Sequence, residues 1–189
     1  MGNMVLMWIH HLVVTAHIRY SLDANFALRG VPAGAHTFSA VGVGWGNLYV
    51  TQRGNASIPP VLHLSTNGKL CTDCPHGGKW GANAVGLAKP AMTWGAHGLA
   101  LEKCLQRCAP DDTITEFARV WIQDFTNHTV TAFSSDGKRL LQLGTPGVAG
   151  NQTDPIQFGN VADAVVVPDS HAGSASVVYA TDGDGGTAN

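Results

Sequence analysis

The chain has 189 residues, enough for one ordinary domain, and only 13% of them are charged, which is about half the share usual in soluble domains. Glycine is abundant, at 23 residues, and together with the low charge this favours short strands joined by tight turns over helices. The formal net charge of -2 comes with no basic run, which argues against a nucleic-acid partner, and no apolar run reaches the ~20 residues of a membrane span.

The first 17 residues differ in character from the rest. The segment Met4 to Ala16 is apolar but interrupted by His10 and His11. It has the apolarity of a degraded signal-peptide core, without a basic start or a clean small-residue cleavage site. A first strand, or sequence from a misplaced start codon, are the alternatives. Residues 1–17 are therefore left unassigned, and the folded domain is expected over residues 18–189.

Short β-branched and aromatic runs recur along the remainder, and no other stretch shows a sustained helical period. The dipeptides Asn67-Gly68 and Asp136-Gly137 each follow such a run and carry strong hairpin-turn chemistry. The sequence therefore predicts an all-β fold. The expected strands lie at residues 47–51, 60–64, 119–124, 129–133 and 174–180.

The strands are arranged as internal repeats. Tyr49, Trp121 and Tyr179 fall at the same place in successive strands. Each copy reads strand, turn, strand, Asx-Gly turn, strand and Gly-rich link, which is the order of a propeller blade of ~40–50 residues. Two segment pairs carry the alignment: Ser65–Lys69 with Ser134–Lys138, offset by 69 residues, and Gly95–Leu101 with Val161–Val167, offset by 66.

An insertion and two cysteine pairs interrupt these repeats. The segment Glu102 to Thr115 is expected to be an exposed loop, and it contains Cys104 and Cys108. With Cys71 and Cys74 these residues form either a four-thiolate zinc site or disulfides. Disulfides are favoured, and the sequence leaves open whether they join neighbours within each pair or link the two pairs.

Three N-glycosylation sequons begin at Asn55, Asn127 and Asn151, all in polar, loop-like stretches. Such tripeptides also arise by chance, but three together favour passage through the endoplasmic reticulum. We therefore expect a secreted or lumenal protein, in the extracellular, lysosomal or granule compartment, and disulfides suit such an oxidising environment.

Several motifs, in order, resemble the NHL-repeat β-propeller family, especially its extracellular members. The matching segments are Arg119–Asp124, Phe133–Lys138, Leu143–Gly147, Asn160–Asp163 and Tyr179–Gly183. The resemblance runs from about residue 20 to residue 189, and extends more distantly to peptidyl-hydroxyglycine amidating lyase. It implies a six-bladed parent, of which this chain carries about two to three blades. We therefore expect a partial propeller, truncated from that parent or, less simply, a short isoform that pairs with another chain.

The same resemblance nominates site residues. His97 matches a zinc ligand of the lyase, and the Leu99 carbonyl matches a group facing a structural calcium. Arg53 matches an active-site arginine. The alternatives are a channel-lining His97 bound to backbone and an Arg53 that pairs with a neighbouring blade. Asp184 stands where the lyase has its catalytic tyrosine, and a carboxylate differs from a phenol in charge, reach and pKa.

These residues lead to a function prediction. The preferred function is a non-catalytic propeller that presents a protein- or peptide-binding surface, with no cofactor of its own and zinc or calcium confined to a full-length parent. One alternative is a fragment of a zinc-dependent amidating lyase, whose tyrosine is missing here. Another is an intracellular interaction module, for which the sequence shows neither a cysteine array upstream nor a strongly basic face.

Overall fold

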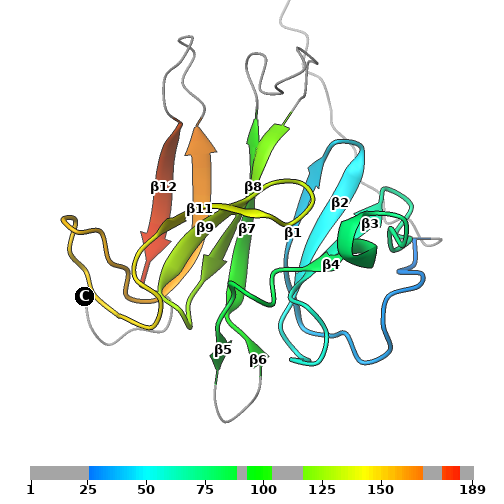
Figure 1. The fold of residues 1–189 in the computed structure, drawn as a ribbon, viewed down its shortest axis with the longest axis horizontal. Helices are drawn as coiled ribbons and strands as arrows, with labels where there is room; N and C mark the ends of the chain where they lie inside the picture. Colours follow the sequence, from blue (N-terminus) through cyan, green and yellow to red (C-terminus); the bar gives the residue numbers. More distant parts are fainter. Residues whose placement is uncertain (1–25, 89–92, 104–116, 168–175, 184–189) are drawn as a thin grey trace, which may run out of the picture.

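The computed structural model describes residues 26–88, 93–103, 117–167 and 176–183, and within these ranges the chain is almost entirely β-structure (Figure 1). Two four-stranded antiparallel sheets are followed by a two-stranded sheet. A single turn of 3-10 helix, η1 (Pro75–Gly78), precedes the last strand of the first sheet. Within the described ranges, no helix is long and apolar enough to cross a membrane.

The first sheet contains four strands in chain order. They are β1 (Phe38–Gly44), β2 (Asn47–Gln52), β3 (Val61–Ser65) and β4 (Lys79–Trp80). A two-residue turn joins β1 to β2, and both of its residues, Trp45 and Gly46, have positive φ, at 50° and 69°. This turn geometry matches the right-handed twist of paired strands.

The second sheet repeats this order, with its first strand packed against that of the first sheet. Its strands are β7 (Ala96–Lys103), β8 (Phe117–Asp124), β9 (Thr129–Phe133) and β10 (Arg139–Leu143). A small hairpin, β5 (Leu87–Ala88) and β6 (Thr93–Trp94), lies between the two sheets in the chain. The third sheet pairs β11 (Val161–Val167) with β12 (Val177–Asp182), and β11 packs against β7.

Strand register confirms that the three sheets are copies of one unit. In each sheet, the ladder between the first two strands ends in a residue pair next to a β-bulge. The aromatic residue lies on the second strand, three positions before the second-strand member of that pair. The pairs are Phe38 with Gln52, Ala96 with Asp124 and Val161 with Asp182, and the aromatics are Tyr49, Trp121 and Tyr179. The predicted equivalence of these three aromatics is therefore correct.

The same register corrects one part of the sequence alignment. Ala96 and Val161 occupy equivalent positions, so the two segments differ by 65 residues rather than the 66 that would pair Gly95 with Val161. A slip of one residue moves every side chain to the opposite face of a strand. The offset of 69 between the Asx-Gly turns is correct, since Ser65 and Ser134 make the same backbone bonds to Lys69 and Lys138.

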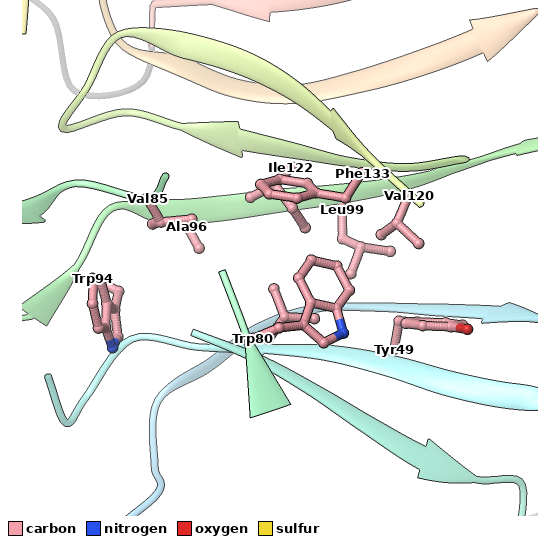
Figure 2. Close-up of a cluster of buried hydrophobic side chains, with 10 residues drawn as sticks. Tyr49, Trp80, Val85, Trp94, Ala96, Leu99, Val120, Ile122 and Phe133 are labelled. Atoms are coloured by element: carbon pink, nitrogen blue, oxygen red, sulfur yellow. The ribbon is translucent and has the colours of Figure 1, made fainter. Parts of the chain in front are cut away.

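A buried aromatic cluster fills the space between the first and second sheets. Figure 2 shows Tyr49 and Trp80 on one side of this space and Ile122 and Phe133 on the other. The rings of Trp80 and Phe133 lie 5.1 Å apart, between centroids, in a tilted arrangement. Burying large apolar side chains removes them from water and provides the main force that holds the sheets together.

A second cluster joins the second sheet to the third. Trp121, Val130 and Ala132 of the second sheet are buried against Phe158 and Val161. In Figure 1 the three sheets stand side by side in chain order, with the third sheet, orange and red, at the left. This fan of antiparallel sheets, each packed face to face on the next, is a partial β-propeller, as predicted.

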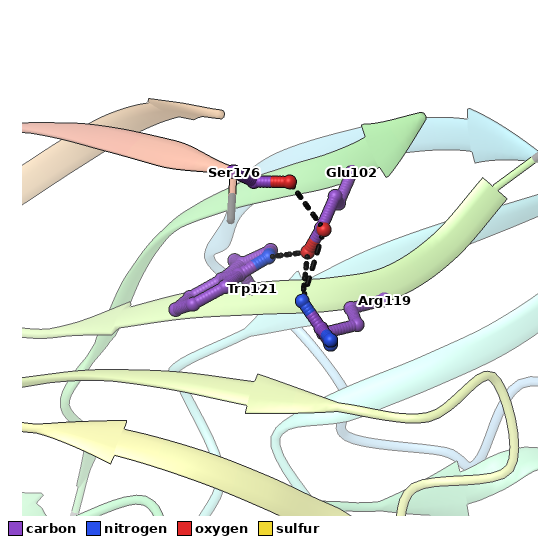
Figure 3. A network of polar contacts seen from close by, with 4 residues as sticks. All are labelled: Glu102, Arg119, Trp121 and Ser176. Atoms are coloured by element: carbon purple, nitrogen blue, oxygen red, sulfur yellow. Dashed lines mark hydrogen bonds and ion pairs between the residues drawn. The ribbon is translucent and has the colours of Figure 1, made fainter. Parts of the chain in front are cut away.

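Glu102 is not in an exposed loop, which corrects the predicted start of the insertion. It lies in β7 and is only 4% exposed. Its carboxylate accepts bonds from Arg119 Nη1 at 2.9 and 3.0 Å, from Trp121 Nε1 at 2.8 Å and from Ser176 Oγ at 2.7 Å (Figure 3). The network ties the second sheet to the start of β12. Lys103 also belongs to β7, and residues 104–115 of the predicted insertion lie outside the described residues.

Candidate functional site

The residue directly after the second strand has the same backbone role in each sheet. Its N–H donates to the carbonyl of the residue that directly precedes the first strand of the same sheet. The residues after the second strand of the three sheets therefore lie at the same end of the fan. These bonds join Arg53 to Thr37 at 3.0 Å, Phe125 to Gly95 at 3.1 Å and Gly183 to Asn160 at 3.1 Å. Side chains at this end from neighbouring sheets are therefore brought together.

Arg53 and Phe125 are in direct contact across the first junction. The guanidinium carbon of Arg53 lies 4.7 Å from the centroid of the Phe125 ring, which is a cation–π arrangement. Arg53 Nε also donates to the carbonyl of Trp94 at 3.3 Å. Both Arg53 and Phe125 are partly buried, so the ring contact and the Nε bond hold the guanidinium in place.

His97 completes this group, which we call the Arg–Phe–His cluster (Arg53, Phe125 and His97). The His97 ring meets Phe125 edge to face, with centroids 6.3 Å apart and planes at 86°. Its Nδ1 lies 3.0 Å from the carbonyl oxygen of Ala162, in the third sheet. The cluster therefore joins residues from the first and second sheets and is anchored to the third.

Gly98 permits the close approach that positions His97. A Cβ at residue 98 would lie 2.5 Å from Gln123 Oε1 and 2.7 Å from the Ala162 carbonyl oxygen, distances that side chains do not tolerate. Only glycine lets the first strand of the third sheet come this near to β7. Gln123, the strand partner of Gly98, is fully buried, so a polar side chain lies in this tightly packed region.

Buried polar side chains hold the turns around the cluster. Asp124, 1% exposed, accepts the backbone N–H groups of Gly86 at 2.6 Å and of Thr126 and Asn127 at 3.0 Å. Burial raises the pKa of the Asp124 carboxyl, and these three backbone bonds act against that rise. Asp182, its equivalent in the third sheet, accepts the Gly159 N–H at 2.6 Å.

The arrangement suits recognition of an anionic or carbonyl-bearing group. Among the described residues, the hydrogen bond that the Arg53 side chain donates comes from Nε, which leaves the Nη groups able to bind a ligand. A guanidinium pre-ordered by stacking binds carboxylates in bidentate fashion with little further loss of side-chain freedom. Arg53 also contacts the neighbouring blade, because Phe125 directly follows β8 of the second sheet.

The described residues contain no ligand cluster that tests the metal expectations. Across residues 26–88, 93–103, 117–167 and 176–183, no three His, Cys, Asp or Glu side chains gather closely enough to hold a metal ion. Zinc at His97, expected only with further ligands from a full-length parent, stays a prediction. Leu99 places its side chain in the core, 8% exposed, and a calcium contact of its carbonyl stays a prediction too. Asp184 lies outside the described residues.

One of the two cysteine pairs is resolved as a disulfide. Cys71 and Cys74 are joined, with Cα atoms 5.3 Å apart, in the turn that leads into η1. This favours pairing within each pair over a link between pairs, and it removes two thiolates from the alternative zinc site. Cys104 and Cys108 lie outside the described residues.

The three sequons differ in their surroundings. Asn55 and Asn127 are partly buried and structurally engaged: the Asn55 Oδ1 accepts the Ser57 N–H at 2.9 Å, and Asn127 Nδ2 donates to the Ala84 carbonyl at 3.2 Å. Asn151 is exposed in an extended loop. The fold therefore presents Asn151 more openly to modification than the other two.

Sequence reasoning missed Phe125 and the Glu102 network. Phe125 was detectable, because it is the repeat equivalent of Arg53 and follows its strand in the same way. Glu102 was missed because a glutamate is more often exposed in a loop than buried in a strand. Here its side chain is only 4% exposed.

Comparison with known proteins gives two related matches. The chain is 40% identical to the human protein "NHL repeat-containing protein 3" over 74 residues, covering 37% of the chain and 20% of that protein. It is 30% identical to the mouse protein of the same name over 154 residues, covering 76% of the chain and 33% of that protein. The chain thus spans about a third or less of these relatives. No family model matches the chain.

Proposed function

The chain belongs to the NHL-repeat family, and from this premise we propose that it is a non-catalytic domain that binds peptides through the Arg–Phe–His cluster in the secretory pathway. The relatives share the repeat, while the ligand and the compartment are our proposals. What supports binding is one observation above all, the Arg53 guanidinium stacked 4.7 Å over Phe125 at the common end of two sheets.

The chemistry of the cluster defines the ligand class. Arg53 offers a fixed pair of donors for a carboxylate, either a peptide C-terminus or an acidic side chain. Phe125 and His97 provide adjoining ring surfaces for an apolar or aromatic neighbour of that carboxylate. Because packing already orders these side chains, binding costs less conformational entropy than it would for a freely moving arginine.

A random-peptide phage library panned on the immobilised chain tests this proposal. The selected peptides are expected to be enriched in acidic residues next to aromatic ones, and Arg53→Ala should remove that enrichment. Arg139→Ala is the matched control, because Arg139 is an exposed arginine on the outer strand β10. Arg53→Lys should give an intermediate result, since lysine keeps the charge and loses the planar fork.

Two outcomes of the panning would contradict the proposal. One is the absence of any enrichment over an uncoated surface. The other is equal enrichment by the parent chain and Arg53→Ala, which would locate binding elsewhere. Circular dichroism of the variants separates lost binding from lost folding.

The secretory compartment is supported by the Cys71–Cys74 disulfide and by the exposed Asn151 sequon. If the endogenous protein passes through the endoplasmic reticulum, an amidase that removes N-linked glycans should lower its apparent mass, and Asn151→Gln should abolish most of that change. An unchanged mass together with reduced thiols at Cys71 and Cys74 would place the protein in a reducing compartment instead.

The amidating-lyase alternative is tested with the same preparations. The observation in its favour is that Arg53 and His97, both nominated by the lyase resemblance, contact the same Phe125 ring. Zinc-dependent cleavage of a peptidyl-hydroxyglycine that Arg53→Ala abolishes would overturn the non-catalytic proposal.

A further inference from the structure

The Cys71–Cys74 disulfide lies next to a buried histidine of β3. Cys74 Sγ is 4.0 Å from His63 Nε2, within reach of a hydrogen bond to sulfur. His63 is only 7% exposed, whereas both cysteines are partly exposed. One of the two sulfurs therefore has an acid–base group beside it, and the disulfide can still be reached from solvent.

Core packing, rather than the disulfide, holds the His63 ring in place. The ring stacks on Tyr49, with centroids 4.6 Å apart and planes at 24°. Tyr49 is fully buried and belongs to the aromatic cluster between the first and second sheets. The imidazole should therefore stay in position beside Cys74 when the S–S bond is broken.

Backbone hydrogen bonds hold the turn that carries the two cysteines. The N–H of Cys71 donates to the His63 carbonyl at 2.9 Å, and the N–H of Cys74 donates to the Cys71 carbonyl at 3.2 Å. The N–H of Gly77 donates to the Cys74 carbonyl at 2.9 Å. Because the cysteines are only three positions apart in sequence, breaking the S–S bond releases a short loop and little chain entropy. Both thiols should therefore stay close to each other and to His63.

The protonation state of His63 suits proton exchange with a neighbouring sulfur. Burial lowers the pKa of His63, so its imidazole is neutral at neutral pH. Depending on its tautomer, a neutral imidazole nitrogen donates its N–H to a thiolate or accepts the proton of a thiol. The other ionisable side chains nearby are Tyr49, on which the ring stacks, and Asp136, which interacts electrostatically with Tyr49 and His76.

We propose that the Cys71–Cys74 disulfide is a site of thiol–disulfide exchange, in which an external thiolate attacks Cys71 Sγ, Cys74 Sγ leaves and His63 acts as the acid–base partner of Cys74. The substrate class is a pair of cysteine thiols on a peptide or protein. The His63 contact assigns the roles, because it favours negative charge on Cys74, and a sulfur that is stabilised as a thiolate leaves faster. This inference does not rest on the proposed peptide binding.

The exchange takes two steps. In the first, a substrate thiolate forms an S–S bond with Cys71 while the Cys71–Cys74 bond breaks, and Cys74 departs with the electron pair as a thiolate that accepts the His63 Nε2–H. In the second, the other substrate thiolate attacks the substrate sulfur of this mixed disulfide, which releases Cys71 as a thiolate and forms the substrate disulfide. The two protons that the substrate thiols lose end on Cys71 and Cys74. The substrate is thus oxidised by two electrons and the protein disulfide is reduced.

Reduction of the purified chain by glutathione, quenched with iodoacetamide and followed by mass spectrometry, tests the proposal. Trypsin cleavage after Lys69 and Lys79 gives one peptide, residues 70–79, that contains Cys71 and Cys74 and neither of the other two cysteines. The same peptide synthesised in its oxidised form lacks His63 and is the uncatalysed reference. The disulfide of the folded chain should be reduced about 10-fold faster than that of the peptide, or more.

A pair of histidine variants locates the effect. His63→Phe keeps an aromatic ring for the stack on Tyr49 and removes the nitrogen that faces Cys74, and it should slow reduction about 10-fold or more. His76→Asn is the matched control, because it removes the other imidazole close to Cys74 in sequence, and asparagine tolerates the φ of 59° at this position. It should leave the rate unchanged.

The pH dependence of iodoacetamide labelling at Cys74 in the reduced chain separates an acid–base role from a structural one. The midpoint should lie about one pH unit or more lower in the parent chain than in His63→Phe, and His76→Asn should match the parent. A folded parent chain that reacts no faster than the peptide would overturn the proposal, and this comparison needs no variant. A folded His63→Phe variant with the rate and midpoint of the parent would overturn it as well.

Discussion

Replacing Glu102 with alanine is expected to destabilise the chain by about 2–4 kcal/mol, and the structure indicates which contact causes most of the loss. The indole N–H of Trp121 donates to the Glu102 carboxylate at 2.8 Å, and Trp121 is 2% exposed. Without its acceptor, this donor is buried and unpaired, which alone costs about 1–3 kcal/mol. The Ser176 bond at 2.7 Å, which reaches across to β12, is lost as well.

Arg119 should matter less, although it is the residue of opposite charge. Its side chain is 41% exposed, so it returns to water when its partner is removed, and Arg119→Ala is expected to cost about 1 kcal/mol or less. Glu102→Gln should fall between the two alanine variants, because the amide oxygen still accepts from Trp121 while its N–H2 group faces the guanidinium unfavourably.

Equilibrium urea unfolding followed by circular dichroism would rank these variants. Trp121→Phe should cost less in the Glu102→Ala background than in the parent chain, because the indole bond is already lost there. If Arg119→Ala proved as costly as Glu102→Ala, the ion pair rather than the buried indole bond would dominate, and the reasoning would be wrong.

Two further predictions concern the first junction. Burial, and secondarily the negative charge of Asp136, raises the pKa of Tyr49 to about 12. Because an unfolded tyrosine loses its proton near pH 10, stability should fall by up to about 2.7 kcal/mol between pH 10 and 12. Alkaline unfolding of Tyr49→Phe should lack this component. Gly42→Ala should cost about 1–3 kcal/mol in urea unfolding because its methyl group would overlap Leu99, and an unchanged midpoint would show that the leucine moves aside freely.

Much of the fold was predictable because turn chemistry and strand alternation are local signals. The Asx-Gly turns at Gly68 and Gly137 have φ of 81° and 85°, which glycine adopts without strain, and they fix the hairpins in place. The one-residue error between Gly95 and Val161 has no origin in the β-bulge, because both segments have it at the equivalent place, between Ala96 and Gly98 and between Val161 and Asp163. Small and apolar residues match in either alignment, and only the pairing with the second strand fixes the register.

The candidate site was predictable only in part, for a different reason. Arg53 and His97 carry a family resemblance in their immediate sequence, but their contact with Phe125 depends on how two sheets are rotated against each other. That rotation is set by packing between residues far apart in the chain, such as Trp80 against Phe133. Local patterns therefore nominate the polar members of the cluster and leave out the ring that orients them.

The dependence of the site on sheet packing also separates two kinds of variant. The Arg–Phe–His cluster draws one residue from the first sheet and two from the second, so its geometry exists only while the first junction is intact. Gly42→Ala strains that junction without touching the cluster, and it should weaken peptide binding and stability together. Arg53→Ala removes a partly exposed side chain at the end of the fan, and it should weaken binding while leaving the unfolding midpoint nearly unchanged.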